Sequence, residues 1–516
     1  MKIGGLGLAV NLVDILQNHI ANKHYELLID FAIENFTELF NNYRVQFASR
    51  IGELPADVQS SHPELAILAA AAHSMLEPYR PIDLVQTQHS LQRISDAAKT
   101  SEDPFTQFRV AGLRLGALRI LMLVDQAAEA ARLWEEVVDS LPPNVILSKK
   151  KMFFVFAVQC VAAYTHGGYF NDAIRAAQRL NQDDNQLRHL HVRSLVSLSY
   201  ALNGDVNSAR KLTNSFDDGR LPEAWDSAYN AIGYHLARAL ISVEDARPHD
   251  ALARLDELDR FFHVVDHWAF ILIVRARALI YLGTPAVAAD EIHKLMLQSA
   301  GRRAGKSTFD LLYAAYLDLL QTAGLYQRVT RMKEYVQERL AAFQLAEARA
   351  VMNTDESQAL TLTREILDSD ASLRHHAESL LVQAIAFQRL DLPDLAEDAA
   401  EKLAASVERN GIPSVLTYAP RPEVLFLLQR RAPQLVELVK DFPYGPDDSI
   451  RSKVILTETQ LRILAQLVSH ASVPKLAESM FISPNTAKTH LRNIYLKLGV
   501  NNRADAVQAA LRLGLI

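Results

Sequence analysis

FISPNTAKTHLRNIYLKLGV, residues 481–500, is the stretch of this 516-residue sequence that decides how its C-terminal part folds. Ser483 can cap a helix through its hydroxyl, and Pro484 suits the first helical position, where an N–H would have no partner. Gly499 stands where a left-handed residue commonly ends a helix. An apolar stripe recurs at helical spacing between these ends: Ala487, Leu491, Ile494 and Leu498. The run therefore predicts one capped helix with one buried face.

The opposite face of this predicted helix is polar and basic. It carries Asn485, Lys488, Thr489, Arg492 and Leu496. Around it, the pattern predicts further helices over residues 457–468, 472–480 and 503–513, with a tight turn at 481–482. Four short helices in this order are typical of a helix-turn-helix unit, which places a recognition helix in the DNA major groove.

The same segment resembles the LuxR/GerE type of helix-turn-helix across residues 452–516. The shared positions are Leu456, Thr457, Ile463, Leu464, Leu476, Ala477, Ser483, Thr486, Lys488, His490, Ile494, Lys497, Leu498, Gly499, Val500, Arg503 and Ala506. The chain departs from the family pattern at residues 459–460, 470 and 473–474 and at Ala487. The resemblance implies a DNA-binding regulator of transcription.

Individual residues receive roles from this resemblance and from their chemistry. Lys488, Thr489 and Arg492 match the family positions that reach base edges. Phosphate contacts are expected from Ser483, Asn485, Thr486, Tyr495, Lys497 and Arg503. The last helix carries a small-residue apolar seam that resembles the family's dimer contact: Ala506, Val507, Ala510 and Leu511. We therefore expect a homodimer on double-stranded DNA.

The charge distribution also favours nucleic-acid binding by the C-terminal end. Residues 451–516 carry nine Lys and Arg against three Asp and Glu, a net charge of +6. Because the whole chain carries −6, residues 1–450 carry −12. Basic groups neutralise phosphates and release counterions, so this asymmetry is expected when one end meets DNA.

Composition points to a soluble, cytoplasmic protein. Hydrophobic residues make up 49% of the chain, which is enough to bury a large core. Cys160 is the single cysteine, so no disulfide framework is possible and a reducing compartment is favoured. The apolar run 152–164 is shorter than the ~20 residues that a membrane span needs. We expect no membrane partner.

Residues 1–440 show nearly continuous helical spacing of apolar residues, interrupted at intervals of 31 to 44 residues. The interruptions lie near Pro81, Asp125, Gly168, Gly204, Arg247, Gly283, Gly324, Asp355 and Asp391. Steps of about 34 to 45 residues are typical of two-helix repeats. The predicted fold is therefore all-α: a tetratricopeptide-like helical-hairpin solenoid followed by a four-helix LuxR-type helix-turn-helix domain.

These patterns predict that the chain is divided into three parts. Residues 1–440 form a helical-repeat sensor or interaction domain, 441–451 a linker rich in Pro, Gly and Asp, and 452–516 the DNA-binding domain. The segment LPADVQSSHPELA, residues 54–66, followed by hairpin repeats, resembles the helical-repeat part of MalT-like regulators. Those regulators usually carry an ATPase module ahead of the repeats, and we expect this chain to lack it.

Residues 300–307 fit a relaxed phosphate-loop pattern, in which Gly305, Lys306 and Ser307 would hold a nucleotide. A functional loop follows a strand, however, whereas residues 288–298 predict an amphipathic helix. A basic loop between helices is the favoured interpretation. We expect no catalytic residues, no cofactor and no enzymatic activity.

Two histidine pairs stand out in the sequence. His263 and His267 share one face of a predicted helix, at a spacing that can hold zinc. No third ligand is apparent nearby, so a packed helix without metal is predicted. The adjacent pair His375 and His376 cannot share one face and is expected to be solvated.

The leading hypothesis is a sequence-specific transcription regulator whose helical repeats bind a controlling ligand or protein partner. One alternative is a scaffold or adaptor protein whose main activity is protein binding by the repeats. The other alternative is an ATP-dependent regulator that uses the Lys306 loop.

Overall fold

The computed structural model describes residues 11–76, 89–94, 96, 103–180, 186–216, 229–259, 262, 266–299, 304–325, 328–329, 341–352, 355–442, 458–469, 472–480, 482–498, 500 and 502–512. Every regular element within these ranges is a helix, which confirms the all-α fold class. Pro81 and most of the predicted linker lie outside the described residues. Among the described helices, none has the length and apolar character to cross a membrane.

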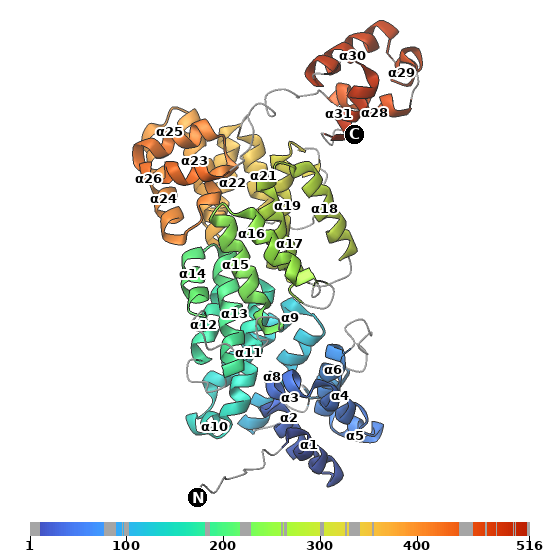
Figure 1. Cartoon of the computed structure of the whole chain (residues 1–516), viewed down its shortest axis with the longest axis vertical. Coiled ribbons are helices and arrows are strands. Elements are labelled where there is room, and N and C mark those ends of the chain that lie inside the picture. Colours follow the sequence, from blue (N-terminus) through green and yellow to red (C-terminus); the bar gives the residue numbers. More distant parts are fainter. Residues whose placement is uncertain are drawn as a thin grey trace, which may run out of the picture.

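Six helices open the chain at one end of the molecule (Figure 1). They are α1 (Leu12–Ala21), α2 (Tyr25–Glu34), α3 (Phe36–Asn42), α4 (Arg44–Gly52), α5 (Ala56–Ser61) and α6 (Pro63–Leu76). The first begins at Asn11 because that side chain accepts a hydrogen bond from the Val13 N–H at 3.0 Å. Helix α2 buries Leu28 and Ile29 and contacts α11, which joins this group to the helices that follow.

The next helices form a long array (Figure 1). In chain order they are α8 (Pro104–Ile120), α9 (Val124–Ser140), α10 (Pro143–Ser148), α11 (Lys150–Gly167), α12 (Phe170–Ala177), α13 (Gln186–Asn203), α14 (Val206–Asn214), α15 (Ile232–Glu244), α16 (Pro248–Leu258), α17 (Trp268–Leu279), α18 (Pro285–Gln298), α19 (Lys306–Thr322), α21 (Ala341–Val351), α22 (Glu356–Leu367), α23 (Leu373–Arg389), α24 (Pro393–Asn410), α25 (Arg421–Arg431) and α26 (Pro433–Asp441). Short 3-10 segments lie between them at η1 (Gln178–Leu180), η3 (Tyr229–Ala231), η5 (Ile280–Leu282) and η6 (Pro413–Tyr418).

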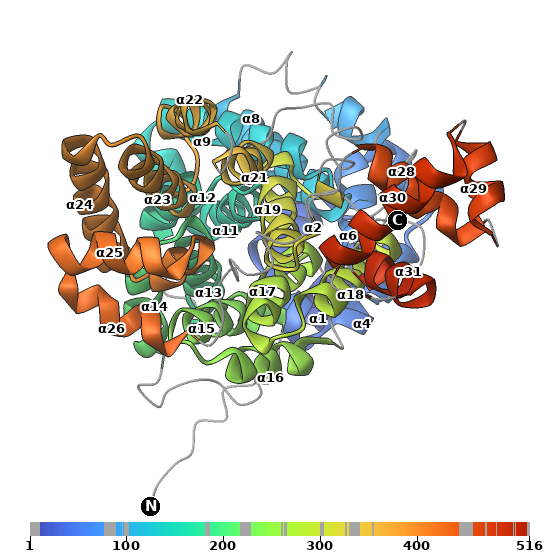
Figure 2. The ribbon, with the colours of Figure 1, turned by 90° about the horizontal axis from the view of Figure 1, so that it is seen from above.

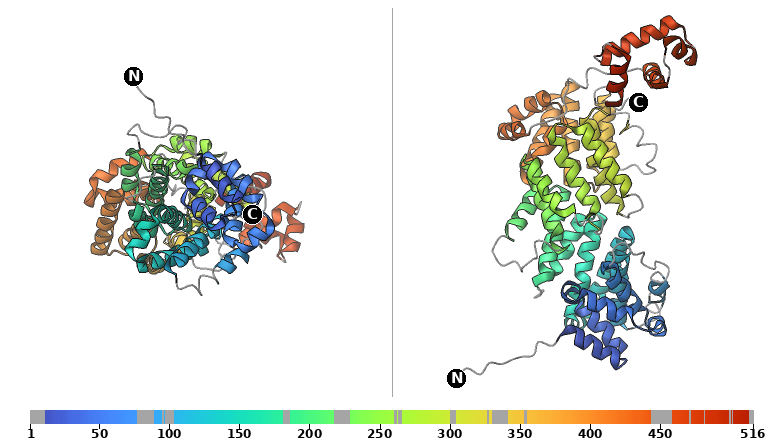
Figure 3. Two further views of the ribbon diagram at one scale, coloured as in Figure 1. Left: turned by 90° about the horizontal axis from the view of Figure 1, so that it is seen from below. Right: turned by 45° about the vertical axis from the view of Figure 1, so that its right-hand side comes forward.

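Consecutive helices of the array pack as hairpins. The pairs are α8 with α9, α11 with α12, α13 with α14, α15 with α16, α17 with α18, α21 with α22, α23 with α24 and α25 with α26. The first helices of successive hairpins also contact one another, from α8 through α11, α13 and α15 to α17, and again from α21 through α23 to α25. Between these two groups, α19 contacts both α17 and α21. The right-hand view of Figure 3 shows these hairpins following one another along the long axis of the molecule, and Figure 2 looks down that axis.

The turns within these hairpins lie where the sequence spacing predicts them. Gly168 ends α11 with a φ of 80°, and Gly283 follows η5 with a φ of 78°. Asp391 turns between α23 and α24 with a φ of 58°. Asp355 caps α22 by accepting a hydrogen bond from the Gln358 N–H at 2.9 Å. Left-handed residues and side-chain caps of this kind end one helix and start the next.

Hairpins far apart in the sequence also touch. A Cβ added to Gly204 would lie 2.8 Å from the backbone nitrogen of Arg374, so these two backbones are in close contact. The Asn207 amide donates hydrogen bonds to the backbone carbonyls of Glu408 and Arg409, each at 3.0 Å. The array is therefore wound so that its later hairpins pack on its earlier ones.

A buried ionic network links four helices inside this winding. The Arg349 guanidinium of α21 lies 2.6 Å from Asp318 of α19 and 3.0 Å from Glu378 of α23. Arg374 of α23 lies 2.8 Å from Glu244 of α15. All five side chains are at most 4% exposed. Their charges are paired, which is the condition under which ionised groups are tolerated in a protein core.

Candidate nucleic-acid interface

Four helices close the chain: α28 (Glu458–Ser469), α29 (Val473–Ser479), α30 (Pro484–Leu498) and α31 (Arg503–Arg512) (Figure 1). Helix α28 contacts α29, α30 and α31, and α30 contacts α29 and α31. They enclose a small apolar core of their own: Ile463, Leu464, Leu467, Leu476, Leu491, Ile494 and Ala510. A separate core of this kind holds α30 in a fixed orientation on α28 and α29.

Local hydrogen bonds set the turn before α30. The Ile482 N–H donates to the Ala477 carbonyl at 3.0 Å, which closes the end of α29. Ser483 then caps α30, because its hydroxyl oxygen accepts from the Thr486 N–H at 3.1 Å. Pro484 is the first residue of α30. The capped start that residues 483–484 predict is thus confirmed, whereas Gly499 lies outside the described residues.

The outer face of α30 carries the side chains predicted to read bases. Lys488, Thr489 and Arg492 are exposed, whereas Ala487 and Leu491 on the inner face are buried. The Thr489 hydroxyl donates to the Asn485 carbonyl at 3.0 Å. Its oxygen lone pairs therefore still face solvent and can accept a hydrogen bond. The face offers two long cations on either side of one short acceptor.

The first turn of α30 is suited to phosphate. Ser483, Asn485 and Thr486 are all exposed there. The helix dipole and the N-terminal N–H groups make this end attractive to anions. Tyr495, in the last turn of α30, is half-buried. Burial raises the pKa of its hydroxyl, so the group is neutral. The Lys497 side chain lies outside the described residues.

Arg503 is placed differently from the other predicted phosphate ligands. Its guanidinium donates to the Leu467 carbonyl near the C-terminal end of α28. The side chain is half-buried rather than exposed. Cations near helix C-terminal ends stabilise the carbonyls that have no partner within the helix. Arg503 therefore helps to hold α31 on α28, a role that its position in the sequence does not reveal.

Part of the predicted dimer seam packs on the domain's own core. Ala506 and Ala510 are 0% exposed, and α31 contacts both α28 and α30. These two residues therefore belong to the domain's own core and are not available to a second chain. Val507 is half-buried against the same core, and the Leu511 side chain lies outside the described residues.

The segment Gly305, Lys306 and Ser307 lies at a joint between hairpins. The helix α18 precedes it and α19 starts at Lys306. A Cβ on Gly305 would lie 2.9 Å from the Gly167 Cα, so the loop packs directly on the end of α11. The Lys306 N–H donates to the Asp125 carboxylate at 3.1 Å. A carboxylate at that N–H would repel a phosphate.

The histidines are arranged differently from the sequence prediction. His263 lies outside the described residues, but His267 is buried next to His166 and Asp266. The expectation that His375 is solvated is wrong, because it is 2% exposed in α23. The contact of His166 with His267 arises from tertiary packing, since the two residues are far apart in the sequence.

Comparison with known proteins locates one family on this chain. Residues 454–510 match the model of the luxR family of bacterial regulatory proteins. The chain is 38% identical over 101 residues to the CsgBAC operon transcriptional regulatory protein of Escherichia coli K12, a match that covers 20% of this chain and 43% of that protein. It is 36% identical over 62 residues to the probable transcriptional regulatory protein NarL of Mycobacterium tuberculosis, covering 12% and 29% of the two chains.

A third relative is the HTH-type transcriptional regulator MalT of Yersinia enterocolitica, 30% identical over 122 residues. This match covers 24% of the present chain and 12% of that protein. The chain thus spans less than half the length of each of these three curated relatives.

Proposed function

Because the C-terminal end of this chain is a helix-turn-helix domain of the luxR family, we propose that the protein regulates transcription by inserting α30 into the DNA major groove. The observation that carries the proposal is the exposed triad of Lys488, Thr489 and Arg492 on the outer face of α30. Long cations of this kind can pair with O6 and N7 of guanine, and a threonine can contact either a donor or a thymine methyl.

Phosphate contacts fix the register of such a complex. We assign them to the exposed residues Ser483, Asn485 and Thr486 at the start of α30, with Tyr495 and Lys497 on its later turns. Arg503 contributes indirectly, because it holds α31 on α28. The net charge of +6 over residues 451–516 adds a sequence-independent attraction that falls as salt rises.

The test is selection of binding sequences from random DNA with the full chain, followed by binding measurements at one salt concentration. Arg492→Ala should cost ~1–3 kcal/mol for the preferred sequence and remove discrimination at one base position. Arg409→Ala is the matched control, because it removes an exposed arginine from α24 of the array. If Arg492→Ala weakened all sequences equally, the base-reading role of α30 would be refuted.

We further propose that two chains bind each DNA site and that the domains are those predicted at residues 1–440, 441–451 and 452–516. Two-fold related domains would read two half-sites one helical turn apart. Ala506 and Ala510 cannot supply the contact, so it would involve other parts of α31 or the array. Analytical ultracentrifugation with a selected DNA site should show two chains per duplex, and a single chain would reject the dimer.

For the controlling signal, we propose that the array binds an anionic ligand in a groove between α14, α15 and α16. The groove has a volume of about 480 Å³. Its lining residues are Arg210, Asn214, Arg238, Ile241, Ser242, Arg247, Asp250, Ala253, Arg254 and Glu257. Because Arg210 and Arg247 pair with Asp245, Arg238 and Arg254 are the cations that we assign to the ligand. A panel of carboxylates and phosphates should raise the melting temperature of the wild type, and Arg238→Ala should abolish the response. A response unchanged by that substitution would place the ligand elsewhere.

A nucleotide-driven switch at Lys306 is not favoured, because Asp125 occupies the N–H that a phosphate would need. A scaffold role would require partner binding by the array without sequence-specific DNA binding. The random-DNA selection therefore separates that alternative from the proposal.

A further inference from the structure

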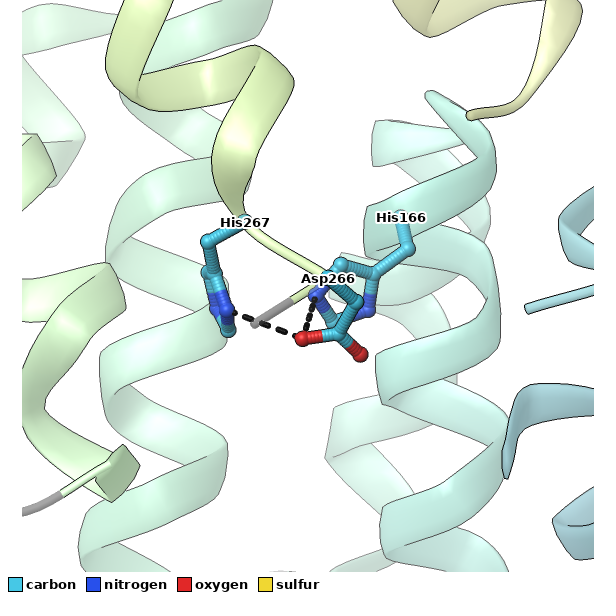
Figure 4. A group of neighbouring side chains, drawn as sticks. All are labelled: His166, Asp266 and His267. Carbon is cyan, nitrogen blue, oxygen red and sulfur yellow. Dashed lines mark ion pairs between the residues drawn. The ribbon is translucent and has the colours of Figure 1, made fainter. Parts of the chain in front are cut away.

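Three side chains from two distant segments, two buried histidines and one half-buried aspartate, meet inside the array (Figure 4). His166 stands at the end of α11, whereas Asp266 and His267 directly precede α17. His166 is 5% and His267 is 1% exposed. The Asp266 Oδ1 atom lies 3.3 Å from His166 Nε2 and 3.1 Å from His267 Nδ1. One carboxylate oxygen is therefore shared by two imidazole nitrogens.

The protonation of His166 follows from its neighbours. Its Nδ1 lies 2.7 Å from the Ala162 carbonyl oxygen, which can only accept a hydrogen bond. Nδ1 therefore carries the proton, and Nε2 of the neutral ring presents a lone pair toward the cluster. A hydrogen bond from the second ring nitrogen to a backbone carbonyl is the usual arrangement of a metal-binding histidine.

The two imidazole nitrogens that face the Asp266 carboxylate have no other hydrogen-bond partner in the described part of the chain. Neither His166 Nε2 nor His267 Nδ1 makes a hydrogen bond of acceptable geometry there. Buried polar atoms without a partner cost free energy, and the His166 lone pair directed at a carboxylate costs more. A shared cation would satisfy all three atoms at once.

The separations of the carboxylate oxygen from the two histidine nitrogens suit a tetrahedral ion, and the two nitrogens lie within 4.8 Å of each other. Ligand atoms bound at about 2.0–2.1 Å in tetrahedral geometry lie about 3.3–3.4 Å apart. The observed separations of 3.3 and 3.1 Å are close to that value. Imidazole nitrogen together with carboxylate oxygen is a donor set that Zn²⁺ accepts, whereas Mg²⁺ and Ca²⁺ prefer oxygen alone.

The surroundings hold the carboxylate in place. The Tyr229 hydroxyl donates to Asp266 Oδ1 at 2.8 Å, and the Arg119 guanidinium donates to the other oxygen, Oδ2, at 3.1 Å. Such outer partners orient a metal ligand. Because Arg119 already balances the charge of Asp266, the cluster offers little net negative charge. This favours an ion that binds nitrogen strongly over one held by charge alone.

Space for a fourth ligand adjoins the cluster. A cavity of about 10 Å³ is lined by Arg119, Met122, Val124, Ala127, Ala163, His166 and Asp266. That volume is about the smallest that holds one water molecule. Three protein ligands with one water complete a tetrahedral site that leaves one position open.

We propose that His166, Asp266 and His267 bind one divalent transition-metal ion, with Zn²⁺ as the first candidate and a water as the fourth ligand. The ion would join the end of α11 to the start of α17. The histidine pair that the sequence suggests, His263 with His267, is thus replaced by a pair formed only by the fold.

The experiment uses the full chain after removal of metal with a chelator. Titration with Zn²⁺ against a chromophoric competitor should show one equivalent bound per chain, and Co²⁺ should give the intense visible absorption of a tetrahedral site. His267→Gln and Asp266→Asn should each lower Zn²⁺ affinity by at least ~100-fold, since loss of an outer partner alone costs 10–100-fold. His235→Gln is the matched control: His235 is 5% exposed in α15 and outside the cluster.

Tyr229→Phe provides a milder variant if the ligand substitutions prevent folding. It keeps the ring and removes only the hydrogen bond to Asp266, so Zn²⁺ affinity should fall ~10-fold while the circular dichroism spectrum stays that of the wild type. The proposal is overturned if the wild type binds no equivalent of Zn²⁺, or if the control loses as much affinity as His267→Gln.

Discussion

Ser483 serves two purposes in the proposed DNA complex. Its hydroxyl oxygen caps α30 at 3.1 Å from the Thr486 nitrogen, and the same exposed side chain lies where DNA phosphate would approach. These purposes can be separated, because an aspartate also caps helices well but repels phosphate.

Ser483→Ala should destabilise α30 by ~1 kcal/mol because the capping bond is lost. Ser483→Asp should keep that stability while lowering DNA affinity, since it places a negative charge beside the phosphates. Amide hydrogen exchange in α30 measures the stability, and fluorescence anisotropy at one salt concentration measures the binding. Wild-type DNA affinity in the aspartate variant would mean that no phosphate approaches Ser483.

Asp245 gives the array a dependence on pH. Burial raises the pKa of this carboxyl, but hydrogen bonds and charges from Arg210 and Arg247 outweigh burial and bring the pKa below its ordinary value. The Arg210 guanidinium binds both carboxylate oxygens, at 2.6 and 3.0 Å. A carboxyl whose folded pKa is depressed stabilises the fold above its unfolded pKa, and this contribution is lost as pH falls through the folded pKa.

Asp245→Asn should therefore cost ~1 kcal/mol of unfolding free energy at neutral pH. The difference from wild type should shrink below about pH 4, where the unfolded carboxyl begins to bind protons. Urea denaturation at a series of pH values measures it. Glu437→Gln is the control, because that side chain is 76% exposed. An Asp245→Asn deficit that persisted at low pH would show that the lost contact is not ionic.

Single residues differ in how far the sequence predicts them. The cap at Ser483 is predictable because all its partners lie within three positions. The role of Arg503 is not predictable, since the sequence does not distinguish an arginine that binds the Leu467 carbonyl from one that faces DNA. Ala506 and Ala510 show the same limit, because a small apolar residue suits both a core and an interface.

At the scale of elements, the hairpin turns were the predictable part. Gly168 and Gly283 take the left-handed conformation that ends a helix. Because glycine is favoured at such a position, the sequence alone shows where the helix ends. The contact of Gly204 with Arg374 is not predictable in this way, because it joins the α13–α14 turn to the start of α23, and these two segments have no common pattern. Winding depends on many small angles between neighbouring hairpins, and no short motif encodes those angles.

Gly204 should therefore be intolerant of any side chain. Its φ is 96°, and a Cβ would lie 2.8 Å from the Arg374 nitrogen. Gly204→Ala should lower the unfolding free energy by ~1–3 kcal/mol through backbone strain and displacement of α23. Thermal melting followed by circular dichroism measures the loss.

Gly116→Ala in α8 is the matched control, since nothing lies within 4 Å of its added Cβ. It should be stabilising by ~0.5–1 kcal/mol, because alanine is favoured over glycine inside a helix. Equal effects of the two substitutions would contradict the close packing of the α13–α14 turn on α23.

The whole molecule depends on ionic links between hairpins that are far apart in sequence. Arg374 pairs with Glu244 at 2.8 Å and with Glu378 at 3.1 Å, and all three are nearly inaccessible to solvent. Arg374→Met should cost ~3–5 kcal/mol, because Glu244 is left buried without its cation and Glu378 keeps only Arg349. Adding Glu244→Gln should restore part of that loss.

Urea denaturation measures these changes. Lys402→Met is the control, because its ion pair with Asp398 is exposed and such pairs are worth ~0.3–0.5 kcal/mol. If Arg374→Met cost no more than the control, the network would not hold the hairpins together.

The contacts of Gly204 with Arg374 and of Asn207 with residues 408–409 also bear on how the array responds to force. An open stack of hairpins extends like a soft spring, because each hairpin holds only its neighbours. Here, contacts join early hairpins to late ones, so a force that pulls the two ends of the array apart must first break those contacts. The array should therefore extend little below a threshold force. Above that force, many hairpins should separate at once.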